Sequence, residues 1–152
     1  MCFALYLGAD EPLPVLLVGD VEEQFYLRAL EGSNDQAALD KFSKPYVYYA
    51  ASWQDCGCGW FVEPVQIALT AKRRAQMRSK AEELTAQCVV ALRALMTDLL
   101  SRSDYVELFL TWEGKQREQP DRKLGLTLDD FVDSGLPLDE GDFAVVTARP
   151  LG

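Results

Sequence analysis

Apolar residues gather in short stretches whose length and alternation predict β-strands. The first stretch is apolar at nearly every position, which is typical of a central strand buried on both faces. A further short run at 15–18 reads as a strand or a packed extended segment. The five principal predicted strands are Met1–Leu7, Gln24–Leu30, Tyr46–Ala51, Tyr105–Trp112 and Phe143–Ala148.

One long helix is predicted between the third and fourth of these strands. Its apolar residues recur at alternating spacings of three and four, which places them on one stripe of a helix. Ser79 followed by Glu82 is a capping-box pattern, so we expect the helix over about 79–100, with Thr70 as a competing start. The predicted stripe consists of Met77, Ala81, Leu84, Cys88, Ala91, Leu95 and Leu99.

The remaining elements are short. Residues 32–35 are expected to form a turn or a helix start, with a short helix through 36–42. Another short helix is capped by Thr127 and runs to Phe131, and residues 114–125 are polar and loop-like. Strands of mixed length around one dominant helix favour an α+β fold. We therefore predict one domain over 1–152, with a single mixed or mostly antiparallel sheet and the long helix packed on one face.

Charge narrows the classes of partner. The chain carries 15 Lys and Arg against 24 Asp and Glu, a net charge of -9. Nucleic acids and anionic membranes attract basic surfaces, so neither is an expected partner. No stretch approaches the ~20 apolar residues that span a bilayer, and the start of the chain lacks the features of an export signal. We expect a cytoplasmic protein whose four cysteines stay reduced.

The absence of histidine is the strongest chemical constraint in the composition. It removes the Ser-His-Asp triad, the Cys-His dyad and every histidine-ligated metal site. Acid–base chemistry would fall to carboxylates, lysine, tyrosine or a thiol.

Cysteines supply the main candidate site. Cys56 and Cys58 are separated by one glycine and followed by another, so their sulfurs can face one side of a loop. Cys2 is the natural third metal ligand if the first strand lies beside this loop, with Asp55 or water as a fourth. Zinc or another thiophilic metal fits such donors. The alternative is that these small residues only fill space beside aromatic side chains, as we expect for Cys88 on the helical stripe.

Two surface features are also candidates. Four aromatic residues around the cysteine loop, Tyr46, Tyr48, Trp53 and Trp60, are a candidate pocket or interface, although aromatic residues at this density also build a core. The second feature is a basic run of Lys72, Arg73, Arg74, Arg78 and Lys80, which could grip an acidic partner or form a solvated helical face.

The segment 43–49, SKPYVYY, followed by CGCGW at 56–60, resembles a family of short, uncharacterised bacterial proteins. Its members begin Met-Cys and carry a KPYVYY strand and a CGCG-aromatic loop, then a helix and a strand similar to 106–112. Trp60 stands where the resemblance leads us to expect phenylalanine. The family has no assigned activity, so the resemblance implies only that Cys2, Cys56 and Cys58 belong together.

Three functions therefore remain open. The first is a metal or thiol site built from Cys2, Cys56 and Cys58. The second is a protein-interaction module without catalytic chemistry, in which the aromatic region or the long helix contacts a protein partner or a second copy in a homodimer. The third is a thiol-dependent enzyme. That enzyme would need Lys44, or an electropositive loop, to activate its thiolate.

Overall fold

The structure is a computed structural model that describes residues 2–15, 25–61, 70–132 and 135–150. Its sheet has six strands in the order β2-β3-β1-β4-β6-β5, and every neighbouring pair is antiparallel except β5 with β6. The α+β prediction is confirmed. The strands are β1 (Phe3–Ala9), β2 (Tyr26–Arg28), β3 (Tyr46–Ala51), β4 (Val106–Trp112), β5 (Arg122–Thr127) and β6 (Asp142–Thr147).

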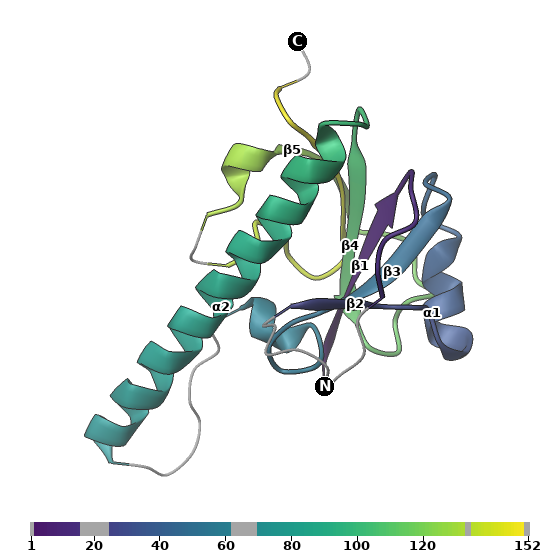
Figure 1. Ribbon diagram of the computed structural model, residues 1–152. Helices are drawn as coiled ribbons and strands as arrows, with labels where there is room; N and C mark the ends of the chain where they lie inside the picture. The colour runs from purple at the N-terminus through teal and green to yellow at the C-terminus, as the bar shows by residue number, and fades with distance from the viewer. Residues whose placement is uncertain (1, 16–24, 62–69, 133–134, 151–152) are drawn as a thin grey trace.

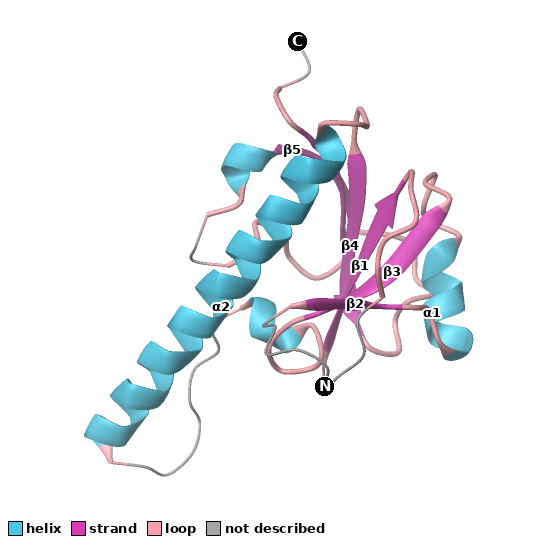
Figure 2. Cartoon of the chain, in the orientation of Figure 1, coloured by secondary structure: helices cyan, strands magenta, loops and turns pink. Residues whose placement is uncertain are grey.

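Strand β1 is central, as its continuous apolar sequence predicted. It pairs with β3 on one side and β4 on the other. Because side chains alternate along a strand, Leu5 and Leu7 join one core cluster, whereas Ala4 and Tyr6 join a second cluster on the opposite face. Each face is covered by a different helix (Figure 2).

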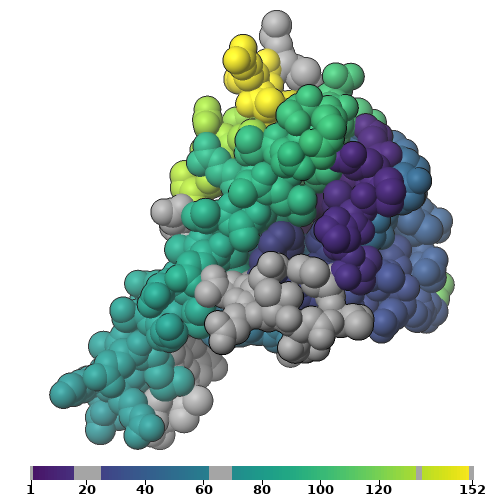
Figure 3. All heavy atoms as spheres, viewed as in Figure 1, coloured from purple at the N-terminus to yellow at the C-terminus, as the bar shows by residue number. Residues whose placement is uncertain are grey.

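Helix α2 (Ala71–Leu100) lies across the first face (Figure 1). It begins earlier than residue 79, because the Thr70 hydroxyl accepts a hydrogen bond from the Arg73 N–H at 3.3 Å. No glycine or proline in 71–78 interrupts the helix. The competing start at Thr70 is therefore the one the structure adopts. Residues 71–80 are all exposed, and this end of the helix extends away from the body of the molecule (Figure 3).

The buried stripe of α2 is offset from the predicted one. Cys88 and Leu99 are buried as expected, but Met77 is 42% exposed because it lies on the projecting part of the helix. The buried stripe includes one polar residue, Thr85, whose hydroxyl is satisfied because it donates a hydrogen bond to the Gly59 carbonyl. An apolar pattern cannot reveal such a position. The buried residues are Thr85, Cys88, Val89, Leu92, Met96 and Leu99.

Helix α1 (Gly32–Leu39) packs on the second face. Of the two predictions for 32–35, a turn or a helix start, the structure adopts the helix start, and the helix ends before the predicted Phe42. Its buried Asp35 accepts hydrogen bonds from the Tyr6 hydroxyl at 2.6 Å, the Arg28 guanidinium at 2.9 Å and the Glu31 N–H at 2.8 Å. These bonds fix α1 to the central strand, and burial with the Asp35 hydrogen bond raises the pKa of Tyr6.

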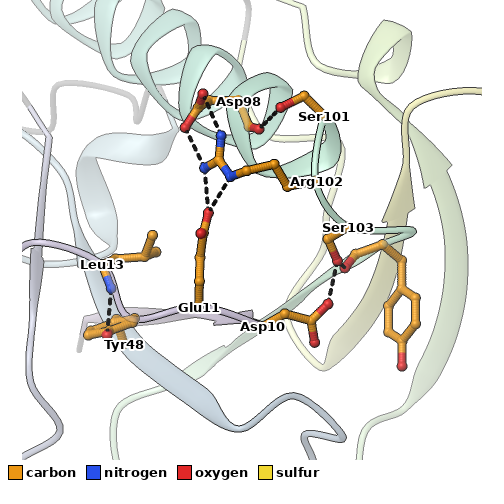
Figure 4. A network of polar contacts seen from close by, with 9 residues as sticks. Asp10, Glu11, Leu13, Tyr48, Asp98, Ser101, Arg102 and Ser103 are labelled. Atoms are coloured by element: carbon orange, nitrogen blue, oxygen red, sulfur yellow. Dashed lines mark hydrogen bonds and ion pairs between the residues drawn. The ribbon is translucent and has the colours of Figure 1, made fainter.

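Residues at the end of β1 tie the sheet to the end of α2 (Figure 4). Arg102 pairs with Glu11 and also with Asp98, one turn earlier on the helix, at 2.9 Å. Asp10 accepts from Lys44 Nζ at 2.8 Å and from the Ser103 hydroxyl at 2.5 Å. Each charged group at this end of the strand therefore has a partner of opposite charge or a hydroxyl donor.

Strand β5 was not predicted, because residues 114–125 are too polar to resemble a strand. It is an edge strand that pairs only with β6, and Leu124 and Leu126 are its only apolar side chains. The short helix after Thr127 is confirmed as a 3-10 turn, η2 (Leu128–Asp130), with a Thr127–Asp130 capping box. The predicted run at 15–18 lies, after Val15, outside the described residues, as do Met1 and Gln24.

Within the described part of the chain, no helix is both long enough and apolar enough to cross a bilayer.

Candidate metal site

The three predicted thiols meet where β1 begins. Since β1 and β3 are antiparallel, the loop that leaves β3 after Ala51 returns beside the start of β1 (N in Figure 1). The sulfurs of Cys2, Cys56 and Cys58 all lie within 4.8 Å of one another. This confirms the expectation that they form one group, and it confirms the strand pairing on which the expectation rested.

Ser52 organises the loop that carries Cys56 and Cys58. Its N–H donates to the Cys56 carbonyl at 2.9 Å and its hydroxyl donates to the same carbonyl at 2.6 Å. The Ser52 hydroxyl oxygen in turn accepts from the Gly59 N–H at 3.0 Å. The side chain is 1% exposed. A single buried hydroxyl therefore fixes the backbone on both sides of the cysteine pair.

Both glycines of the CGCG motif are needed because the loop approaches other groups closely. The Gly57 N–H donates to the Phe3 carbonyl at 2.9 Å, and a Cβ at Gly57 would lie 2.6 Å from the Phe3 carbonyl carbon. A Cβ at Gly59 would lie 2.7 Å from Trp53 Nε1. Any larger residue would push the loop away from β1 and separate its sulfurs from Cys2.

Helix α2 supports the loop from the side. Cys58 begins a 3-10 turn, η1 (Cys58–Trp60), that packs against α2. Thr85, fully buried on α2, donates to the Gly59 carbonyl at 2.9 Å and accepts from Trp53 Nε1 at 3.4 Å. The position of the thiols thus depends on the packing of the helix as well as on the sheet.

Backbone N–H groups point at two of the sulfurs. The Cys58 N–H donates to Cys56 Sγ at 3.4 Å, and the Phe3 N–H donates to the sulfur of Cys58. Such bonds orient a thiolate and stabilise its negative charge, as outer-shell hydrogen bonds do at metal sites. The arrangement suits sulfur in its deprotonated, metal-binding form.

Burial disfavours the deprotonated form of these thiols. Burial raises the pKa of the Cys58 thiol to about 12, even though the Phe3 N–H acts in the opposite direction. Burial also raises the pKa of Cys56, with a smaller opposing effect from the Cys58 N–H. The Cys56 and Cys2 thiols add to the increase at Cys58, because two thiolates this close repel each other. At Cys56 the Cys58 side chain lowers the pKa through a hydrogen bond, whereas the Cys2 thiol raises it. A bound cation would remove that repulsion.

Among the described residues, no fourth histidine, cysteine or carboxylate joins the group. Asp55 is exposed and adopts a left-handed backbone with φ 65°, and its carboxylate lies outside the cluster. Of the two fourth ligands considered, Asp55 or water, the Asp55 carboxylate therefore does not join the thiols in this structure. Glu113 donates its N–H to the Cys2 carbonyl, but its carboxylate accepts from the Tyr49 hydroxyl and from Gln116 Nε2.

Lys44 is not near the thiols. Its ammonium group bonds to Asp10 and lies 3.6 Å from the centre of the Tyr105 ring, at the opposite end of β1. The thiol-dependent enzyme would need Lys44 beside a thiolate, but β3 lies between Lys44 and the CGCG loop and separates the two by its full length. Lys44 cannot activate these cysteines in this fold.

The four aromatic residues do not face one pocket. Trp60 is fully buried, donates to the Ala50 carbonyl and packs on Phe25, and Tyr48 is 9% exposed. Tyr46 is 40% exposed and Trp53 is half-buried. Core packing thus accounts for Trp60 and Tyr48. A different aromatic cluster lies beside the thiols, where Phe3 stacks on Trp112 with ring centroids 3.9 Å apart.

Ser52, Thr85 and the Phe3 backbone are the site residues that the sequence did not reveal. Ser and Thr are common in loops and helices, and a backbone donor has no sequence signature at all. Cys88 stays outside the site, buried on α2, where burial raises its pKa to about 11.

Comparisons with known proteins place the chain in no characterised group. No protein-family model matches it, and neither a curated protein nor a solved structure resembles it closely enough to count as a match.

Proposed function

We propose that this protein binds one thiophilic metal ion, with zinc as the first candidate, through the thiolates of Cys2, Cys56 and Cys58. The observation that carries the proposal is three sulfurs within 4.8 Å of one another, two of which accept backbone N–H bonds. Thiolate donors select zinc, Cu(I) and iron–sulfur clusters over hard cations.

Packing alone explains this cluster poorly. A cysteine that fills space is normally buried, as Cys88 is, whereas Cys2 is exposed and Cys56 and Cys58 are only half-buried. The two glycines and the Ser52 hydroxyl hold the sulfurs together at a surface, where the gain in buried apolar area is small.

A thiol-dependent enzyme is also less consistent with the geometry. A nucleophilic cysteine needs a lowered pKa, which a nearby cation or helix N-terminus usually provides. Here burial raises the pKa of Cys56 and Cys58, and Lys44 lies at the far end of β1.

The decisive experiment is elemental analysis of protein purified from its own host without chelator. We expect one equivalent of a thiophilic metal, lost in Cys2→Ser, Cys56→Ser and Cys58→Ser. Cys88→Ala is the matched control, because it removes a thiol that lies outside the cluster. A wild-type protein that is metal-free and takes up neither zinc nor Cu(I) in reduced buffer would refute the proposal.

A second candidate function, association between chains, is favoured by the exposed start of α2. Residues 71–80 carry five of the 15 cations and none of the 24 acidic residues. All the acidic residues therefore lie outside this basic segment. We infer that residues 71–80 bind the acidic surface of a second copy of the chain. The apolar stripe of α2 is covered by its own sheet, so it is not the contact.

Sedimentation at low and high salt tests this association. We expect a dimer at low ionic strength that dissociates as salt screens the charges, and that is absent when Lys72, Arg73 and Arg74 are replaced by Gln. Replacing Lys115, Arg117 and Lys123 by Gln changes the net charge equally and is the control. A wild-type monomer at every salt concentration would exclude this function.

A further inference from the structure

We infer that the metal site keeps one coordination position open for a donor from another molecule, a thiol or an imidazole, so that it is an exchange site. This inference rests on the proposed function and concerns what completes the coordination of the ion. It starts from the donor set, because zinc and cobalt(II) bound by thiolates are normally four-coordinate, whereas three sulfurs converge here and no further cysteine or carboxylate of the described residues joins them.

Two carboxylates of the described residues, those of Glu113 and Asp55, do not complete the site. Both oxygens of Glu113 are engaged, one with the Tyr49 hydroxyl at 3.2 Å and one with Gln116 Nε2 at 2.7 Å. Gln116 is fully buried and also donates to Tyr6, so freeing Glu113 would leave buried polar groups unpaired. The Asp55 carboxylate lies outside the thiol cluster.

Exposure shows from which side a donor would approach. Cys56 and Cys58 are half-buried against the loop and β1, whereas Cys2 is exposed. An ion held by all three is therefore shielded by protein on the side of the CGCG loop and accessible on the side of Cys2. Structural zinc sites, by contrast, are closed by four protein ligands.

Charge selects the chemistry of the incoming donor. Three thiolates leave a divalent ion with one net negative charge, in a chain of net charge -9, so a carboxylate or phosphate would be repelled. A neutral imidazole adds no charge. A thiol that releases its proton to solvent also becomes negative, but its soft sulfur bonds strongly enough to soft ions to offset the repulsion, which the hard oxygen of a carboxylate or phosphate does not. Since the chain has no histidine, an imidazole must come from another molecule.

Cobalt(II) tests the open position, because its visible absorption reports the donors and the coordination number. The protein is loaded with one equivalent of cobalt under reducing, metal-free conditions and titrated separately with imidazole and with 2-mercaptoethanol. We expect a saturable change in the visible bands with a one-to-one end point for at least one of the two ligands, while cobalt stays on the protein after gel filtration. Cys88→Ala should behave in the same way.

Three outcomes would overturn the inference without touching the proposed function. The bands could stay unchanged at saturating concentrations of both ligands, which would mean that the protein supplies a fourth donor. The ligands could strip the cobalt from the protein. Acetate and phosphate could shift the bands as effectively as imidazole and thiol, which would contradict the charge argument. Failure to bind cobalt through sulfur at all would instead refute the proposed function.

Discussion

The two ends of strand β1 use polar residues in opposite ways. At its far end, Glu11 pairs with Arg102 (Figure 4). Asp10 there pairs with Lys44, so these charged groups satisfy one another. At its start, Cys2 meets Cys56 and Cys58, three donors of the same kind. The first arrangement pairs opposite charges and holds the sheet to α2. The second is the site at which we propose that a metal ion binds.

The comparison explains why a polar cluster is by itself a weak indicator of function. The Asp10 end is richer in charge, yet its hydrogen bond from Lys44, aided by Ser103, lowers the pKa of Asp10 in the way expected of a structural ion pair. At the thiol end the pKa values of Cys56 and Cys58 rise instead. The direction of the pKa shift, downward at Asp10 and upward at Cys56 and Cys58, therefore differs between the two ends.

Replacing Cys56 or Cys58 with Ser should have the largest effect. Because the ion binds only the folded chain, its loss removes stability of about 4 kcal/mol when free metal is a thousand times above its Kd. We expect a lower melting temperature in metal-loaded samples, and chelator should lower the wild-type melting temperature to the same level. If chelator leaves the melting temperature of the wild type unchanged, no bound metal stabilises the start of β1, and the proposed difference between the two ends of the strand is refuted.

Gly57→Ala should come next. The added Cβ collides with the Phe3 backbone and moves the loop, so metal affinity should fall by about 10- to 100-fold, as for loss of outer-shell support. Gly125→Ala is the matched control, since nothing lies within 4 Å of a Cβ there. Competition with a chromogenic chelator measures both. Equal affinities for the two variants would show that the thiols tolerate a shift of the loop.

Asp10→Asn should change the dependence of stability on pH and leave metal binding intact at neutral pH. The pKa of Asp10 is lowered in the folded state, so its contribution is present above the unfolded value of about 3.9 and is lost as pH falls through the folded value. In the Asn variant the free energy of unfolding should therefore fall less than in the wild type as the pH is lowered through this range. Chelator-treated samples unfolded in urea between pH 2 and pH 5 provide the test, with exposed Asp104→Asn as the control.

The smallest effect is expected for Asp55→Asn. The Asp55 carboxylate lies outside the thiol cluster, and Asn tolerates the left-handed backbone at this position. Metal content and melting temperature should both match those of the wild type. A fall in metal content would identify Asp55 as a ligand and remove the open position that distinguishes this end of β1.

Particular elements show how far sequence reasoning reaches in this protein. The central strand, the aromatic strand and the long helix were predicted because their apolar patterns are long and regular. Strand β5 was missed because an edge strand with two apolar side chains, Leu124 and Leu126, has little pattern to detect. The start of α2 was misplaced because two capping signals competed, and the choice between Thr70 and Ser79 depends on hydrogen bonds that sequence does not rank.

The sequence by itself determined which donors are available: four thiols, no histidine, and a CGCG loop that follows a strand. Strand pairing made the meeting of Cys2 with Cys56 and Cys58 predictable. Only the tertiary structure decided that Lys44 lies at the other end of β1 and that Asp55 is not a member of the cluster. The reason is physical: sequence spacing bounds how far apart two residues can be, whereas hydrogen bonds such as those of Ser52 and Thr85 decide where a side chain lies.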